Sequence, residues 1–251
     1  MLLLFTIGGD DLQFELTGCD IYILGFDGVY LDSKISGQST IKLMSANRVT
    51  LEVFCANTGS YTLKSRNLDV LTLTVATASN TADEYPLVTN VELAAINRPS
   101  YLTDLQNLTE SEIDSFDRVH MSQGNRDASI CGFWMGVGTN CSMVAPWGSE
   151  QPSSTNEQCP FSQFQGQRGL NATVYTNAHK LVTTVGAVNQ WTLYGLGNSK
   201  HPLHVHVNHF QIISFEGDGS TESDGTEDYF QVGQWRDTIP AFQGKLTFRF
   251  K

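Results

Sequence analysis

Apolar and polar residues alternate with a period of two along much of the chain. The alternation is clearest between Ile21 and Val75, where it marks the segments 41–43, 49–55, 61–63 and 71–75. A period of two is that of a β-strand, whose successive side chains point to opposite faces. Turn-forming Gly, Asn and Asp separate the segments, as in Phe26-Asp27-Gly28. The pattern therefore predicts a β-meander from a sandwich or barrel, not alternating strands and helices.

The pattern weakens over residues 76–86, which we interpret as a link between a partial domain at 1–78 and a second domain at 79–251. Within the second domain one helix is predicted over 102–116, because Thr109-Glu110-Ser111-Glu112 resembles an N-terminal signal. The Gly-, Ser- and Asn-rich stretch 121–169 predicts a surface excursion. Strand periodicity returns at 172–175, 190–194, 201–212 and 245–250.

Composition and charge exclude two classes of partner. The net charge of -11, without any basic stripe, disfavours nucleic acid and anionic lipid. No apolar run approaches the roughly 20 residues of a membrane-spanning helix, so no membrane insertion is predicted. Met1–Phe5 is apolar but lacks a basic n-region, so the chain shows no signal peptide and this segment predicts an internal strand.

Five cysteines, an odd number, are spaced too widely for a zinc knuckle, and the sequence leaves their pairing open. Sequons at Asn107, Asn140 and Asn171 permit glycosylation. Together with the low charge they predict a glycoprotein in an extracellular or secretory-lumen setting. The acidic stretch 216–228 lacks EF-hand spacing and predicts a solvated loop rather than a calcium site.

The most informative stretch is HPLHVHVNHFQI at 201–212, which contains four of the six histidines. In an extended chain His204 and His206 point to one face, and neutral imidazoles suit copper, zinc or iron. His201 precedes Pro202 and can turn to a different metal, while His209 has the opposite parity to the pair. These positions predict two ligands on one face and a third nearby, and histidines that only hydrogen-bond to the backbone are the alternative.

This stretch and its surroundings resemble the multicopper oxidase family, specifically the motif that opens the ligand set of its last cupredoxin (plastocyanin-like) domain. Gly186–Leu193 before the histidines and Gly233–Thr238 and Phe248–Phe250 after them fit the same pattern. Asn97–Leu105 looks like the entry to that domain. Ala46–Val53 with Thr58–Leu63 looks like the end of the preceding, middle domain.

The resemblance implies an all-β fold of cupredoxin-like Greek-key units, one partial and one nearly complete. It implies copper as cofactor, with His201 on the type 1 copper, His204 on the type 2 copper and His206 on one type 3 copper. It implies no ligand role for His209. It also implies a small-molecule or metal-ion reductant and dioxygen as partners. In that family substrate is oxidised at the type 1 copper, and a three-copper cluster reduces dioxygen to water.

The sequence also departs from the family pattern. No cysteine is flanked by histidine, and His120 and His179 stand alone, so the thiolate ligand and most cluster ligands are not among these residues. Two interpretations follow: a truncated copper oxidase, inactive alone, or a non-catalytic cupredoxin-derived metal-binding or structural protein. We favour the first, because the chain stops in mid-domain; an unrelated cupin-like zinc protein lacks the expected spacing. Asp237 and Trp235 are interpreted as structural and left out of the site.

Overall fold

The computed structural model describes residues 2–4, 12–77, 86–123, 135–138, 183–196, 201–217, 230–241 and 244–251. Almost all the regular structure in these residues is strand, so the predicted all-β, cupredoxin-like class is confirmed. Several sequence predictions fall on residues outside this description. They concern most of the link 76–86, of the stretch 121–169 and of the acidic loop 216–228, the strand 172–175, His179, and the sequons at Asn140 and Asn171.

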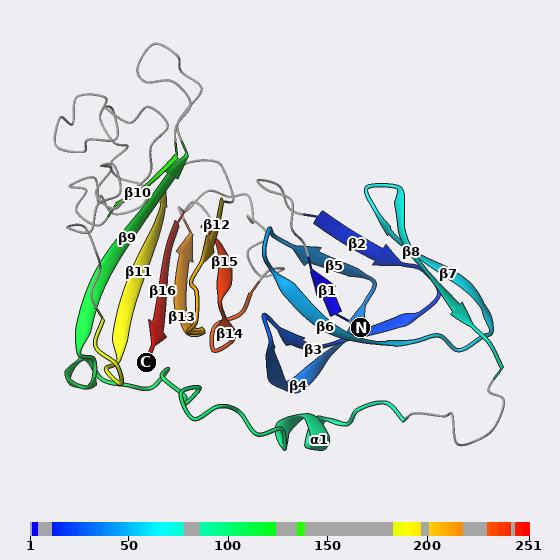
Figure 1. Cartoon of the computed structure of the whole chain (residues 1–251), viewed down its shortest axis with the longest axis horizontal. Coiled ribbons are helices and arrows are strands. Elements are labelled where there is room, and N and C mark those ends of the chain that lie inside the picture. Colours follow the sequence, from blue (N-terminus) through cyan, green and yellow to red (C-terminus); the bar gives the residue numbers. More distant parts are fainter. Residues whose placement is uncertain are drawn as a thin grey trace, which may run out of the picture. The chain divides into compact units, whose positions relative to one another are not determined.

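The chain divides into two compact units, Met1–Ser100 and Tyr101–Lys251, and each is described by itself. Unit 1 consists of two four-stranded sheets, ordered β1-β6-β3-β4 and β5-β2-β7-β8 (Figure 1). Their strands are β1 (Leu2–Leu4), β2 (Leu12–Leu16), β3 (Asp20–Phe26), β4 (Val29–Gln38), β5 (Thr40–Leu43), β6 (Arg48–Phe54), β7 (Gly59–Ser65) and β8 (Leu68–Val75). The alternating apolar residues of both sheets form one core, so the unit is a β-sandwich.

The segment after the link packs on unit 1 through polar contacts. Lys34 donates from Nζ to the Val88 carbonyl at 2.7 Å, and Glu52 accepts from the Val88 amide at 2.7 Å. The short helix α1 (Asn90–Ala94) follows, with Thr89 and Glu92 forming a capping box. Hydrogen bonds from Thr89 lower the pKa of the Glu92 carboxyl below its usual value. The predicted boundary at 78/79 stays a prediction, because residues 78–85 lie outside the described ranges.

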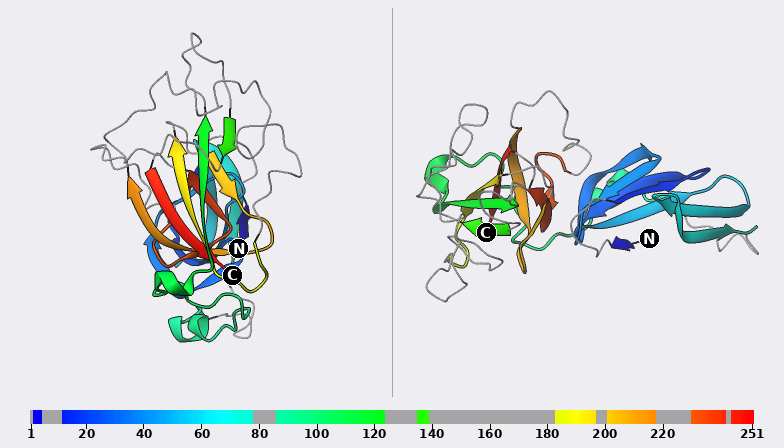
Figure 2. Two further views of the ribbon diagram at one scale, coloured as in Figure 1. Left: turned by 90° about the vertical axis from the view of Figure 1, so that its left-hand side faces the viewer. Right: turned by 90° about the horizontal axis from the view of Figure 1, so that it is seen from above.

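Unit 2 contains a six-stranded sheet, ordered β10-β9-β11-β16-β13-β14, and a two-stranded sheet, β12-β15. Its elements are the 3₁₀ helix η2 (Glu110–Glu112), β9 (Ser115–Gln123), β10 (Met135–Gly138), β11 (Asn189–Leu196), β12 (His201–His204), β13 (Phe210–Gly217), β14 (Trp235–Arg236), β15 (Thr238–Ala241) and β16 (Gly244–Phe250). The left view of Figure 2 shows β13, β16, β11 and β9 side by side as orange, red, yellow and green arrows. The predicted strands at 190–194 and 245–250 are thus confirmed.

The helix predicted over 102–116 is wrong. Only Glu110–Glu112 form a helical turn, and β9 begins at Ser115. Long-range side chains hold the backbone polar groups of this segment. Gln211 accepts from the Leu105 amide at 2.6 Å, and Arg249 donates to the carbonyl oxygens of Leu105, Gln106 and Leu108 at 2.6, 3.1 and 3.3 Å. These partners replace the hydrogen bonds that a helix would make.

Aromatic packing fixes the strands that carry the histidine stretch. Phe210, at the start of β13, packs on Phe248 of β16 with ring centroids 4.4 Å apart, and both are fully buried. Trp191 of β11 meets Phe250 edge to face at 5.2 Å. Side chains of this size stabilise a core by both buried area and ring geometry. The chain that leaves the histidines therefore enters β13 at a rigid position.

Candidate metal centre

The histidine stretch lies on one of two antiparallel segments that change sheets together. The first runs from β12 to β13 and the second from β14 to β15. β12 pairs with β15 in the two-stranded sheet, and β13 pairs with β14 in the six-stranded sheet. Each segment therefore turns a corner, at 205–209 in the first and at Asp237 in the second. This shared corner is the site that we describe below.

Strand register brings particular residues together at the corner. His204 is the last residue of β12 and lies opposite Thr238, the first residue of β15. The ladder continues one step further, because the Val205 amide donates to the Asp237 carbonyl at 2.9 Å. Asp237 and Thr238 are both buried, at 7% and 1% exposure. The first histidine of the close pair thus sits against a buried polar pair.

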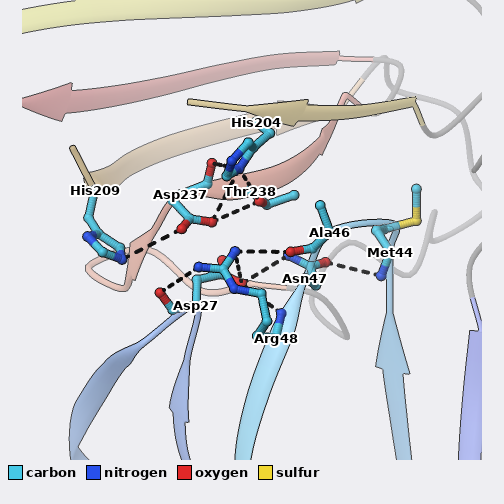
Figure 3. Close-up of polar contacts among 9 residues, drawn as sticks. All are labelled: Asp27, Met44, Ala46, Asn47, Arg48, His204, His209, Asp237 and Thr238. Atoms are coloured by element: carbon cyan, nitrogen blue, oxygen red, sulfur yellow. Dashed lines mark hydrogen bonds and ion pairs between the residues drawn. The ribbon is translucent and has the colours of Figure 1, made fainter. Parts of the chain in front are cut away.

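The His204 ring makes its contacts through Nδ1. This atom lies 2.7 Å from the Thr238 hydroxyl oxygen and 3.2 Å from the Asp237 carbonyl oxygen. It is also 3.5 Å from Asp237 Oδ1, which accepts a hydrogen bond from the Thr238 hydroxyl at 2.8 Å. Figure 3 shows these contacts converging on the edge of the His204 ring. All hydrogen bonds of this ring to described residues use Nδ1. Nε2 makes no hydrogen bond to a described residue.

His206 lies in the bend after β12, and its ring meets that of His204 edge to face with centroids 4.7 Å apart. The two imidazoles are thus neighbours, although His206 follows the strand rather than continuing it. Both residues are exposed. His201 begins β12 and lies opposite Ala241 in register. Its predicted role as a ligand stays a prediction.

His209 lies beside the same carboxylate as His204. Its Nε2 is 3.8 Å from Asp237 Oδ2, within electrostatic contact but beyond hydrogen-bond distance. Asp237 therefore lies between the histidines at the two ends of the first corner, as the dashed lines of Figure 3 show. The sequence pattern predicts no ligand role for His209, and this contact gives it a structural one.

Figure 3 also draws a second polar network, which belongs to unit 1. The Asp27 carboxylate accepts from the Arg48 amide at 3.0 Å, and Arg48 Nη2 donates to the Asp27 carbonyl at 3.0 Å. Asn47 accepts from the Met44 amide at 3.1 Å. These contacts close the turns around β3, β5 and β6, which is a structural role.

Among the described residues, no group of three or more His, Cys, Asp or Glu side chains is placed to hold a metal ion. The described part of the site thus offers a pair of adjacent imidazoles. A pair can contribute ligands to a larger set, and imidazole nitrogen is a good ligand for copper.

Comparison with known proteins shows which family this part of the chain resembles. Residues 148–251, which include the whole histidine stretch and the second corner, match the family model described as multicopper oxidase. These residues are similar in sequence to the multicopper oxidase family. The predicted resemblance to multicopper oxidases is therefore confirmed. No curated protein matches the chain in sequence at a significant level.

Solved multicopper oxidases share the fold of the chain. A metallo-oxidase from Campylobacter jejuni matches with 17% identity and a TM-score of 0.58, over 100% of this chain and 47% of its own. A multi-copper oxidase from Pediococcus acidilactici matches with 12% identity and a TM-score of 0.58, over 100% and 42%. A laccase from Botrytis aclada matches with 14% identity and a TM-score of 0.53, over 100% and 46%. The chain spans less than half the length of each.

His204 and His206 fit copper at the level of ligand chemistry. Two neighbouring imidazoles, one of them hydrogen-bonded at Nδ1, are the donor type that copper binds. The site predicted from the sequence leaves out Asp237 and does not single out Thr238. Their sequence signal is weak, because strand register, not spacing along the chain, places them beside His204.

Proposed function

We propose that the chain supplies part of the copper-ligand set of a multicopper oxidase. His201 is the proposed ligand of the type 1 copper, His204 of the type 2 copper and His206 of one type 3 copper. The observation that carries this proposal is the close approach of the His204 and His206 rings, 4.7 Å between centroids. The two rings lie at the corner within residues 148–251, which match the multicopper oxidase model. Adjacent rings can serve one ion or two neighbouring ions.

When bound, copper supplies one-electron transfer from the reductant and a place for dioxygen reduction. The chain's own contribution is to hold the imidazoles. Register with β15 fixes the backbone at His204, and Phe210 anchors the far side of the corner in the core. Positioned ligands of this kind reduce the freedom lost on metal binding.

The proposed partners are dioxygen and a small-molecule or metal-ion reductant. The structural relatives support this class, since they include a metallo-oxidase and a laccase. The 251 residues alone are proposed to be inactive as an oxidase, because none of the five cysteines is flanked by histidine to provide the thiolate of a type 1 site.

We place the protein outside the cytosol, in the extracellular space or the secretory lumen. The Cys19–Cys55 disulfide supports this location, because disulfides persist in oxidising compartments. Asn107 supports a glycosylated state, since it is exposed in a turn and begins the sequon Asn107-Leu-Thr. Among the described residues, no helix is long and apolar enough to cross a membrane.

Copper titration of the 251-residue chain tests the proposed ligands. The unaltered chain should bind Cu(II), and the double variant His204→Ala/His206→Ala should lose that binding. His179→Ala is the matched control, a histidine that stands alone in the sequence, and should bind as the parent does. Visible absorption should lack an intense thiolate-copper band, and oxygen uptake with a phenolic reductant should be absent. Equal copper affinity in the double variant and the parent would refute the ligand assignment.

A further inference from the structure

We propose that Thr238 and Asp237 are positioning residues that fix the tautomer of His204. They keep the ring proton on Nδ1 and leave the lone pair on Nε2 for a metal ion. The inference deepens the proposed function. It rests on that function, which makes His204 a ligand of copper. It assigns a role to a residue pair that the histidine motif does not contain.

The first step is to decide whether Nδ1 donates or accepts its hydrogen bonds. The Asp237 carbonyl oxygen, 3.2 Å from Nδ1, has no hydrogen and can only accept. It already accepts from the Val205 amide at 2.9 Å, which fixes its position in the ladder. A hydrogen bond between this carbonyl and the ring therefore requires a proton on Nδ1.

The second step concerns the Thr238 hydroxyl, which has one hydrogen. Asp237 Oδ1 lies 2.8 Å away and accepts that hydrogen. The hydroxyl oxygen then has only lone pairs to offer to Nδ1 at 2.7 Å, so it accepts from the ring. The buried carboxylate thus sets the direction of the hydroxyl, and the hydroxyl sets the proton of the imidazole.

Both steps give the same tautomer. A neutral imidazole with its proton on Nδ1 has its lone pair on Nε2, the atom through which it can bind a metal. A histidine ligand whose other nitrogen donates to an oxygen is also oriented and made more basic. The register pair His204 and Thr238 builds this arrangement into the sheet, so it exists before any metal arrives.

The tautomer can be observed directly by ¹⁵N NMR of the metal-free chain, at a pH where the His204 ring is neutral. His204→Gln identifies the signal. The parent should show a protonated Nδ1 and an unprotonated Nε2. Thr238→Val removes the hydroxyl and keeps the shape, so the Nε2-protonated form should gain population. Thr238→Ser restores the hydroxyl and should restore the parental spectrum.

The outcomes separate positioning from fold. Thermal melting checks that Thr238→Val folds, and Thr238→Ser serves as the conservative variant if it does not. A ring protonated at Nε2 in the parent overturns the inference. The inference is also overturned if Thr238→Val shows the same tautomer as the parent. It is likewise overturned if Thr238→Ser does not restore the parental tautomer.

A copper arm separates this inference from the proposed function. Thr238→Val should weaken Cu(II) binding by roughly 10- to 100-fold, the usual loss when the partner of a ligand histidine is removed. Thr238→Ser should bind as the parent does. If His204→Ala binds copper as the parent does, the ligand assignment fails, whatever the NMR shows. If His204→Ala loses copper and Thr238→Val does not, the ligand assignment stands and the positioning role fails.

Discussion

At the scale of single residues, Val207 in the first corner has a strained backbone conformation. Val207 has a φ of 77° and is 92% exposed. Left-handed backbone is tolerated by Asn and Asp, as at Asp27 with a φ of 51°, but a β-branched side chain crowds it. The conformation places Asn208 so that its amide donates to the His206 carbonyl at 3.0 Å. The turn after His206 therefore has a backbone conformation that is unfavourable for the valine at its centre.

Replacing Val207 by Gly should stabilise the chain. Left-handed backbone costs a non-glycine residue roughly 1–2 kcal/mol. The greater freedom of glycine in the unfolded chain offsets about 0.5–1 kcal/mol of that relief. We expect a net gain of roughly 0.5–1 kcal/mol in the free energy of unfolding, measured in urea. The matched control is Val185→Gly, at another fully exposed valine without a positive φ, which should lower stability. Equal losses in both variants would contradict strain at Val207.

At the scale of elements, β16 holds the segment that precedes β9. Arg249 on β16 is buried and donates from Nη1 to carbonyl oxygens of residues 105–108 and from Nε to Gln190 at 2.8 Å. Burial lowers the pKa of this guanidinium, which nevertheless stays charged at any ordinary pH. A single side chain thus ties β16, β11 and the connection into β9 together.

Arg249→Met should destabilise the chain strongly. The variant keeps an apolar stem but leaves carbonyl oxygens without their donor, at a cost of roughly 2–4 kcal/mol in the free energy of unfolding. Lys245→Met on the same strand is the control. Lys245 pairs with Glu216 at 3.0 Å on an accessible surface, and such pairs contribute only about 0–1 kcal/mol. Chemical denaturation compares the two, and similar losses would remove the special role of Arg249.

The same element shows what local sequence predicts and what it does not. Period-two alternation correctly indicates β6, β11 and β16, because a half-buried strand alternates apolar side chains on its buried face with polar side chains on its exposed face. The helix predicted over 102–116 fails because Arg249 and Gln211, more than 100 residues away, take its backbone groups. Likewise the HPxHxH motif predicts the histidine ligands, whereas strand register places Asp237 and Thr238 beside His204. Local periodicity carries no information about such long-range partners.

At the scale of the whole molecule, the Cys19–Cys55 disulfide and the tryptophans belong to different units. The Cys19–Cys55 disulfide joins the residues just before β3 and just after β6, where Asp20 and Phe54 are partners in register. It closes a loop with a sequence separation of 36 within unit 1. All tryptophans of the chain, Trp134, Trp147, Trp191 and Trp235, fall within the residue range of unit 2. Tryptophan fluorescence therefore reports on unit 2, whereas far-ultraviolet circular dichroism reports on the strands of both.

Removing the disulfide should therefore destabilise one unit and spare the other. Restricting the unfolded chain over a loop of this length contributes about 4 kcal/mol, so Cys19→Ala/Cys55→Ala should lower the stability of unit 1 by roughly that amount. In urea the circular dichroism transition should broaden and move to lower concentration, while the fluorescence midpoint stays in place. Phe248→Ala, in the core of unit 2, is the reciprocal control and should move the fluorescence midpoint. If the cysteine variant shifts both signals together, the units unfold as one cooperative body rather than as two.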